Sequence, residues 1–232
     1  MRFRSVIFAM AVGAFCVTEG LIGGENDPMD AIQALAEKVI RNPYDLESFE
    51  KVQKLTNSSD YWHRFYGLEF VGQIGIRRPE LRPKVVPILV RALNEETDQA
   101  MLRETVSSIR DIGRVAVEAA WSPLVAFVQR GEERDVTWFA AQALGKVRDR
   151  KLLGESIRVL VRAMARPPTI GVQVEAPAVR YDALGALVEI GESGAADVLG
   201  PIKDREKTAD PYFEKRLRRA IARLEAMGVS VN

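Results

Sequence analysis

The chain has 232 residues with an apolar fraction of 47% and a charged fraction of 28%, proportions typical of a soluble globular protein that can bury a core. Its formal net charge of +1 argues against a strongly basic or acidic footprint for nucleic acid or an anionic membrane surface. The single cysteine, Cys16, and the single histidine, His63, exclude an intrachain disulfide and a His/Cys zinc cage.

The N-terminal segment, residues 1–24, differs from the rest of the chain. Arg2 and Arg4 precede an uncharged run over residues 5–18, shorter than the roughly 20 apolar residues that span a bilayer. This pattern is typical of a secretory signal peptide or an anchor helix, and it predicts an exported protein that is periplasmic, secreted or envelope-anchored. A bacterial lipoprotein signal would end at Cys16, but Phe15 occupies the position of its small residue, so cleavage, lipidation and retention all stay open.

Beyond residue 26 almost every segment has apolar residues at helical spacing, and no long run alternates strictly, which predicts an all-α fold. Asp27-Pro28, Asn42-Pro43 and Asp210-Pro211 each place a capping side chain before a proline, as at a helix start. Residues 25–58 are expected to form a polar helix pair that caps the N-terminal end of a larger helical body over residues 59–232.

This larger body shows internal self-similarity. Its predicted first helices each end on an apolar residue, usually followed by a glycine, and we expect these glycines to act as left-handed C-caps. We call these helix-end residue pairs the repeat marks; they are Ile74-Gly75, Ile112-Gly113, Val147-Arg148, Ile190-Gly191 and Met227-Gly228. They recur at spacings of 38, 35, 43 and 37 residues, a range typical of helical-hairpin repeats. Shorter amphipathic segments follow the first four marks at 85–93, 121–129, 157–164 and 195–204.

The segments AAQALGKV (140–147) and ALGALVEIG (183–191) resemble the first-helix pattern of HEAT repeats, including the HEAT-like type found in phycobilisome lyases. The resemblance covers roughly residues 60–228 and implies a right-handed α-α superhelix, a HEAT-like solenoid, whose second helices line the concave surface. Two departures are Arg148, which stands in place of a glycine, and a last repeat without a second helix. Stacked hairpins bury a core that one hairpin cannot bury alone.

Two proline-containing segments interrupt the regularity and are predicted to be irregular. Residues 76–83 form a turn inside the first repeat, and residues 166–178 form a loop that lengthens one repeat spacing. The loop is either a tolerated surface insertion, the interpretation we favour, or a carrier of binding residues.

Catalytic groups are scarce in this sequence. His63 begins a predicted helix among aromatic residues, where a capping or structural role is favoured over general-base chemistry. The adjacent carboxylates, such as Glu95 and Glu96, fall in predicted turns, and no glycine-rich phosphate loop is present. We therefore expect a non-enzymatic protein with no cofactor and no metal. A pigment-handling protein resembling the phycobilisome lyases remains an alternative.

The predicted function is a protein-protein interaction scaffold that binds another protein, with membrane contact only through the N-terminal segment. The candidate partner-binding residues are four basic residues on the second helices: Lys84, Arg91, Arg158 and Arg162. Arginines held at regular spacing on a rigid scaffold can bind carboxylates of a partner through two parallel hydrogen bonds. The alternative is that they are ordinary solvent-exposed residues.

Two further groups of side chains leave alternatives open. The basic helix over 214–223 offers a nucleic-acid-binding alternative, although a solvated face of a capping helix is favoured. Most aromatic residues should be core. Tyr61, Trp62 and Tyr66 form either an exposed anchor patch or, the interpretation we favour, packing buried under the N-terminal cap.

Overall fold

The computed structural model describes residues 28–131, 134–165, 176–205 and 210–230, and all regular structure within these ranges is helical. The predicted all-α solenoid is confirmed. The predicted signal or anchor segment, residues 1–24 with Cys16, lies outside the described residues. The elements in chain order are α1 (Pro28–Arg41), α2 (Leu46–Leu55), α3 (Tyr61–Arg77), η2 (Pro79–Leu81), α4 (Arg82–Glu95), α5 (Gln99–Ile112), α6 (Arg114–Ala119), α7 (Trp121–Arg130), α8 (Arg134–Leu144), α9 (Arg150–Met164), α10 (Ala176–Glu192), η3 (Ala196–Val198), α11 (Leu199–Lys203) and α12 (Pro211–Ala226).

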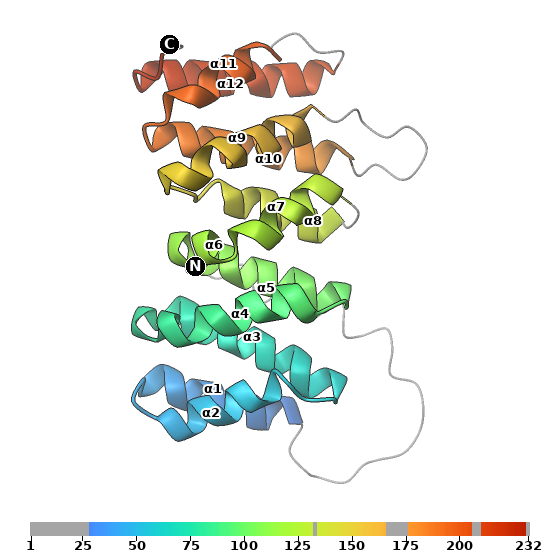
Figure 1. The fold of residues 1–232 in the computed structure, drawn as a ribbon, viewed down its shortest axis with the longest axis vertical. Coiled ribbons are helices and arrows are strands. Elements are labelled where there is room, and N and C mark those ends of the chain that lie inside the picture. The colour runs from blue at the N-terminus through green and yellow to red at the C-terminus, as the bar shows by residue number, and fades with distance from the viewer. Residues whose placement is uncertain (1–27, 132–133, 166–175, 206–209, 231–232) are drawn as a thin grey trace.

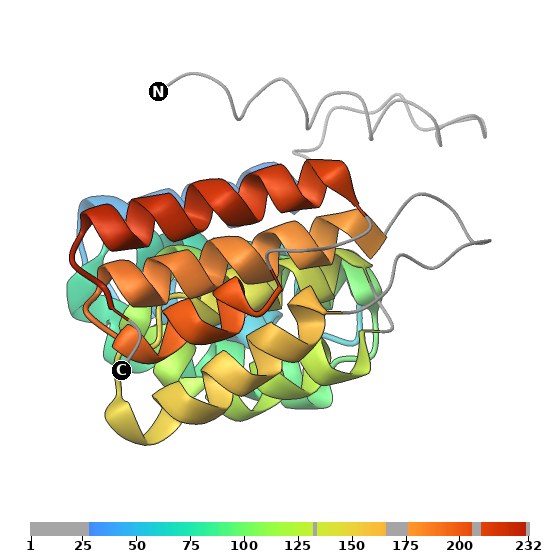
Figure 2. The ribbon, with the colours of Figure 1, turned by 90° about the horizontal axis from the view of Figure 1, so that it is seen from above.

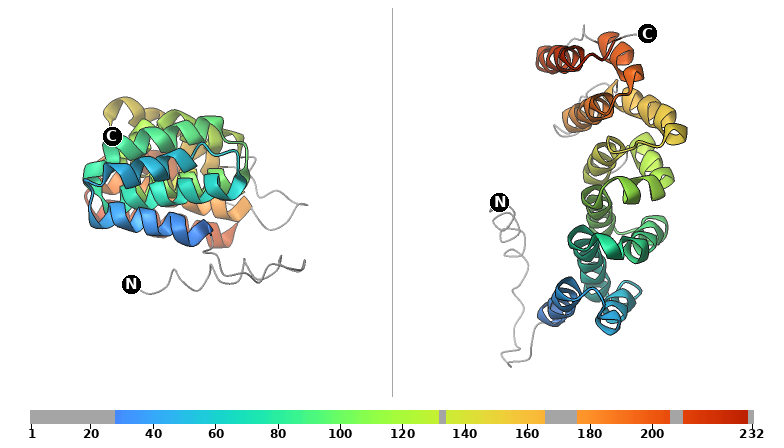
Figure 3. Two further views of the ribbon diagram at one scale, coloured as in Figure 1. Left: turned by 90° about the horizontal axis from the view of Figure 1, so that it is seen from below. Right: turned by 90° about the vertical axis from the view of Figure 1, so that its left-hand side faces the viewer.

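The helices form two layers (Figure 1; Figure 3). The first layer contains α1, α3, α5, α8, α10 and α12, and each helix of this layer packs against the next one in the row. The second layer contains α2, α4, α6, α7, α9 and α11. One continuous apolar core runs between the layers from Ala36 in α1 to Leu224 in α12. The helix pair α1 and α2 extends both layers and shares this core.

The array is curved, and its concave side is the first layer. In Figure 2 and in the right-hand view of Figure 3, α1 and α12 at the two ends are displaced to the same side of the middle helices. The expectation that the second helices line the concave surface is therefore wrong for this chain.

The physical reason for this curvature lies in packing distances. Small residues let first-layer helices approach closely: a Cβ added at Gly145, just after α8, would lie 2.9 Å from the Cα of Ala186 in α10. One repeat contributes two helices, α6 and α7, to the second layer, and neighbouring helices of this layer contact each other less extensively than those of the first layer do. An array bends toward the layer in which neighbours lie closer. The helix α6 is an element that the periodicity analysis did not predict.

Two of the predicted helix starts agree with the structure, and one is displaced. Helix α1 begins at Pro28, and Asp210 caps α12 by accepting hydrogen bonds from the N–H groups of Tyr212 (3.0 Å) and Phe213 (3.1 Å). Helix α2 begins after Asp45, whose Oδ1 accepts the Ser48 N–H at 3.0 Å. Asn42 closes the preceding turn by accepting the Tyr44 N–H at 3.2 Å. Asn42 and Asp45 are both suited to capping and lie three residues apart, and Asp45 is the one that caps the helix.

The glycines at the repeat marks have two roles, where the sequence predicted one. Gly113 ends α5 with a φ of 98°, a conformation that side chains rarely adopt. Gly75 and Gly191 instead lie inside α3 and α10, so the prediction that they cap helices is wrong. A Cβ at Gly75 would come within 2.7 Å of Ile112 and Val85. This glycine is needed for close packing.

Arg148, which replaces the expected glycine, closes the third repeat with its side chain. Its Nη1 donates to the carbonyl oxygens of Gly145 (2.6 Å) and Val147 (2.8 Å) after the end of α8. Its backbone N–H and that of Asp149 both donate to Glu118 Oε1 at 2.9 Å. The last carbonyls of α8 accept the N–H groups of Gly145, Lys146 and Val147, and the guanidinium binds carbonyls of the turn that follows.

The predicted irregular segments fall partly inside the described ranges. Residues 76–83 contain the end of α3, the short helix η2 and the start of α4, as a proline-broken turn should. Residues 166–175 of the predicted loop lie outside the described residues, and residues 176–178 already belong to α10. No helix within the described ranges is both long and apolar enough to span a bilayer.

Candidate functional site

A row of polar side chains crosses three neighbouring helices of the first layer. Arg110 of α5 donates from Nη1 to Gln142 Oε1 of α8 at 2.8 Å, and Gln142 Nε2 donates to Asp182 Oδ1 of α10 at 2.9 Å. All three side chains are half-buried. We call Arg110, Gln142 and Asp182 the polar row, because each comes from a different repeat and together they link three repeats across the first layer.

The guanidinium of Arg110 is held in place from several sides. Its Nε donates to Asp111 Oδ1 at 2.9 Å, its Nη2 donates to Ser107 Oγ at 3.2 Å, and its plane lies over the Phe139 ring at 4.5 Å. A planar cation that stacks on an aromatic ring and donates several hydrogen bonds loses little further freedom when a ligand binds. The polar row is therefore preorganised.

An aromatic platform stands at the start of α3. We use this name for Tyr61, Trp62, Phe65 and Tyr66. The Trp62 ring stacks on that of Tyr66 with centroids 5.8 Å apart and packs edge-on against Tyr61 at 5.0 Å. Trp62 is 56% exposed and Tyr61 is 36% exposed. The favoured prediction that this patch is buried under the N-terminal cap is wrong, and the exposed alternative agrees with the structure.

The reason for this exposure is the direction from which the N-terminal helix pair packs. A Cβ at Gly67 of α3 would lie 2.8 Å from backbone atoms of Leu55 and Thr56 at the end of α2. Gly67 is five residues after Trp62, which places it on a different side of the helix. Helix α2 thus covers the Gly67 side and leaves the Trp62 side open.

Two carboxylates lie beside the platform. Glu69 of α3 is half-buried and follows Tyr66 by three residues, so the two side chains are neighbours on the helix surface. Burial and, to a smaller extent, the nearby carboxylate of Glu104 on α5 together raise the pKa of Glu69 to about 7. No cation among the described residues counteracts this rise in pKa. The sequence analysis overlooked this pair because its members are far apart in the chain and come together only through repeat stacking.

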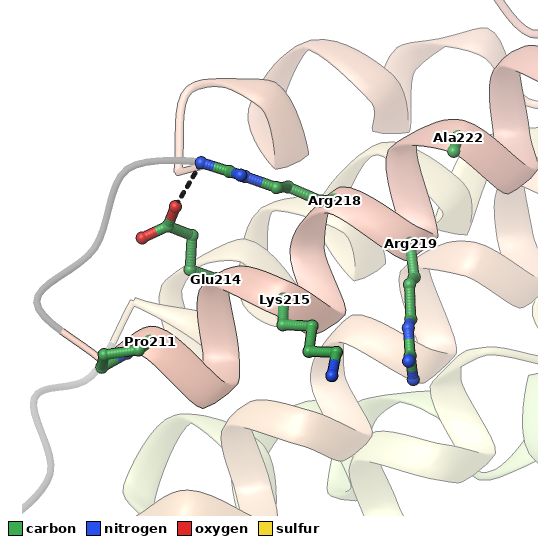
Figure 4. Close-up of a pocket in the computed structure, with 6 residues that line it drawn as sticks. All are labelled: Pro211, Glu214, Lys215, Arg218, Arg219 and Ala222. Carbon is green, nitrogen blue, oxygen red and sulfur yellow. Dashed lines mark hydrogen bonds and ion pairs between the residues drawn. The ribbon is translucent and has the colours of Figure 1, made fainter.

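The opposite end of the array is basic. A shallow pocket of about 370 Å³ runs along α12, and its described lining comes from that helix alone. In Figure 4 the side chains of Lys215 and Arg219 extend in the same direction, while Arg218 turns away to pair with Glu214. Arg223 pairs with Glu192 of α10, and Arg216 lies over the Tyr181 ring at 4.6 Å. Much of the basic run over 214–223 is thus engaged in contacts within the protein.

The four basic residues predicted as partner-binding lie in the second layer, on the convex side. On α4, Lys84 lies over the Phe49 ring at 5.9 Å and Arg91 donates to Asn57 Oδ1 at 2.6 Å. On α9, Arg158 bonds to Glu155 of its own helix and Arg162 is exposed. Helices α4 and α9 are separated in the layer by α6 and α7, so the structure does not bring the two pairs together.

His63 has a structural position. Its backbone N–H donates to Asp60 Oδ1 at 2.8 Å, and its ring Nδ1 lies 3.4 Å from the same carboxylate, as part of the cap of α3. Within the described ranges, no group of His, Asp and Glu side chains is arranged to hold a metal ion. Asp60 is the capping residue, so of the two roles predicted for His63, capping or structural, the structural one agrees with this geometry.

The fold resembles solved repeat proteins. A designed armadillo repeat protein superposes with a TM-score of 0.60 at 15% identity, covering 86% of this chain and 96% of that one. Computationally designed armadillo repeat proteins for modular peptide recognition give 0.57 at 14% identity, covering 83% and 91%. An archaeal HEAT-like repeats protein from Thermococcus onnurineus NA1 gives 0.56 at 13% identity, covering 90% and 84%.

These likenesses establish the armadillo/HEAT-like repeat fold that the sequence pattern predicted. No protein-family model matches the chain, and no curated protein matches it in sequence.

Proposed function

We propose that this protein is a scaffold that binds an extended segment of another protein along the concave face of its first helix layer. The observation that carries the proposal is the polar row, in which half-buried hydrogen-bonding side chains from three successive repeats are linked across α5, α8 and α10. Such groups can pair with the backbone of an extended chain, which has a donor and an acceptor at every residue except proline.

The dimensions of the surface fit such a ligand. Packed helices lie 8 to 10 Å apart, whereas an extended chain advances about 3.3 Å per residue. A segment crossing the helices would therefore pass one repeat for about every three residues. The likeness to designed proteins for modular peptide recognition supports the same mode of binding.

This proposal places the partner on a different face from the one that Lys84, Arg91, Arg158 and Arg162 define. Three of those residues already hold local contacts within the second layer. Their role as partner-binding residues remains a separate hypothesis, which the same experiment addresses.

A site-specific crosslinking experiment separates the two faces. A photoreactive phenylalanine derivative replaces Ser107, next to the polar row, or Arg162 on the convex layer, and the full chain is irradiated in an extract of its native cells. We expect adducts from position 107 and few from position 162. Adducts from position 162 alone would overturn the proposal in favour of the convex face.

Export is a second part of the proposal and rests on residues 1–24 alone. If these residues direct export, the mature chain has a new N-terminus, a lipid at Cys16 or a retained membrane tether. Intact-mass measurement of the natively purified protein distinguishes these forms. A full-length chain recovered from the soluble cytoplasmic fraction would exclude export.

Two alternatives have their own tests. A pigment-handling protein would carry visible absorbance after native purification. Nucleic-acid binding through Lys215 and Arg219 would give an affinity that falls steeply with salt. The scaffold is favoured over nucleic-acid binding because Arg216, Arg218 and Arg223 are engaged within the protein.

A further inference from the structure

The aromatic platform at the start of α3 is an exposed surface that is already ordered. Trp62 is 56% exposed, yet its ring is fixed between neighbours, stacked on Tyr66 and edge-on to Tyr61 and Phe65. The Tyr61 hydroxyl also reaches Asp98 Oδ1 at 3.4 Å. Rigid aromatic side chains supply contact area at low cost in conformational entropy, so such surfaces are frequent anchors in protein interfaces.

The charge around the platform indicates which ligand it suits. Glu69 lies on the same side of α3 as Trp62 and Tyr66, at helical spacings of seven and three residues, and Glu104 stands beside it on α5. The arginines near the platform that act on Tyr61 have carboxylate partners of their own: Arg64 lies 2.8 Å from Glu96, and Arg103 lies 3.7 Å from Asp135. Glu69 has no cation partner among the described residues.

We infer that the platform and its two carboxylates seat a lysine or arginine side chain of the extended partner segment, between the Trp62 and Tyr66 rings and Glu69. A cation over an aromatic face is attracted by the electrons of the ring, and the attraction grows when water is excluded. A bound cation would also relieve the repulsion between Glu69 and Glu104. This inference rests on the proposed function and names the side-chain chemistry recognised near the α3 end of the concave face.

Synthetic peptides test the inference on the full chain. The probe is a fluorescein-labelled ten-residue peptide of alternating lysine and serine, and its control replaces every lysine with glutamate. Fluorescence anisotropy gives the dissociation constant at two salt concentrations. We expect the lysine peptide to bind and the glutamate peptide not to bind.

Matched variants locate the binding. The double variant Glu69→Gln, Glu104→Gln is expected to bind the lysine peptide at least about tenfold more weakly than the wild type, since a desolvated charge pair is lost. Glu95→Gln, which removes a carboxylate from α4 in the second layer, should change the affinity by less than twofold. Trp62→Ala is expected to weaken binding about fivefold, and Trp62→Phe should restore most of it by keeping a ring.

The outcomes separate this inference from the proposed function. Equal weakening by the Glu95 variant and by the Glu69/Glu104 variant would reduce the effect to general electrostatics and overturn the inference. If the native partner still crosslinks at position 107 in the Glu69/Glu104 variant with undiminished yield, the partner binds the concave face but does not place a cation at the platform. If the protein that carries the photoreactive group at position 107 but keeps Glu69 and Glu104 forms no adducts, the proposed function itself is rejected.

Discussion

The two helix layers of this solenoid differ in how closely their helices approach and in what they present to solvent. First-layer helices meet at positions such as Gly145, where a Cβ would lie 2.9 Å from the Ala186 backbone. Neighbouring second-layer helices contact each other less extensively, as at the α4/α6 and α7/α9 pairs, and Gly154 of α9 faces solvent, where an added Cβ would meet nothing within 4 Å. The first, tight layer is concave and carries the polar row and the aromatic platform, whereas the second, loose layer lies on the convex side.

Curvature and the polar row have a common origin in the sequence. Small residues at first-layer contacts shorten one side of the array, and the same shortening aligns Arg110, Gln142 and Asp182 closely enough for direct hydrogen bonds. If packing in the first layer is loosened, the polar row should separate before the core is lost.

The largest effect is expected from a side chain added in the tight layer. Gly145→Val should destabilise the protein by about 3 kcal/mol or more, because the obstructing atom is backbone and cannot rotate away. Gly154→Ala in the loose layer should instead stabilise it by about 0.5 to 1 kcal/mol through helix propensity. Urea unfolding followed by circular dichroism measures both. Similar values at the two sites would contradict the packing difference.

The next effect concerns a buried arginine that ties the layers together near the C-terminal end. Arg180 is 7% exposed, donates from Nε to the Met164 carbonyl at 3.2 Å and lies over the Phe213 ring at 4.1 Å. Its Nη1 is 3.6 Å from Asp210, the cap of α12. Arg180→Ala should cost about 2 to 4 kcal/mol, because it removes the buried hydrogen bond to the Met164 carbonyl and the packing of the guanidinium over the Phe213 ring.

Hydrogen exchange supplies the finer test of Arg180. In the Arg180→Ala protein, we expect α12 to lose amide protection while α3 and α5 keep theirs, because repeat arrays couple mainly nearest neighbours. The exposed Arg158 is the matched control, and Arg158→Ala should leave the protection of α12 unchanged. Uniform loss of protection along the whole array would show that Arg180 does not act locally.

A smaller effect, of opposite sign, is expected at Glu69. Its pKa rises from 4.5 to about 7 on folding, so between these pH values the native state holds a proton that the unfolded state has released. Stability should therefore fall as pH rises through this window. Glu69→Gln should remove that fall and stabilise the protein by about 1 to 3 kcal/mol at pH 8, with little change at pH 4.5.

The Glu69 measurement compares unfolding free energies of the wild type and the variant at both pH values. Glu95→Gln in the second layer is the control and should be neutral at both. A variant that is equally stabilised at pH 4.5 and pH 8 would point to packing as the cause, since the proton would then play no part. A stabilising change at a residue that also binds a partner is the usual trade between stability and function.

How far sequence reasoning reaches can be judged from particular elements. The helix pairs, their spacing and the turn at residues 76–83 follow from periodicity and proline, which act locally. The direction of curvature does not, because it depends on how closely Gly145 approaches Ala186 and on the unexpected helix α6. Local rules also mistook Gly75 for a helix cap, since a glycine needed for packing and a glycine needed for its φ look alike in sequence.

The candidate site was harder to predict than the fold. The prediction chose Lys84, Arg91, Arg158 and Arg162 because arginines recur at matching repeat positions. Arg110, Gln142 and Asp182 are three different residue types and show no such recurrence. Their link appears only when stacking brings the three helices together. A search for polar residues on the outward stripe of each first helix would have found them.

The smallest effect is expected on the convex layer, and it bears most directly on which face binds. Arg162→Ala, alone or with Arg158→Ala, should change stability by less than about 0.5 kcal/mol, because Arg162 is exposed and Arg158 pairs only within its own helix.

Neither variant should weaken partner binding, whereas Gln142→Ala, which breaks the polar row at its centre, should weaken it about tenfold. The measurement is the dissociation constant of each variant for the partner identified by crosslinking. A loss of affinity in the Arg162 variant with none in the Gln142 variant would place the working surface on the convex side and make the concave row a purely structural brace between repeats.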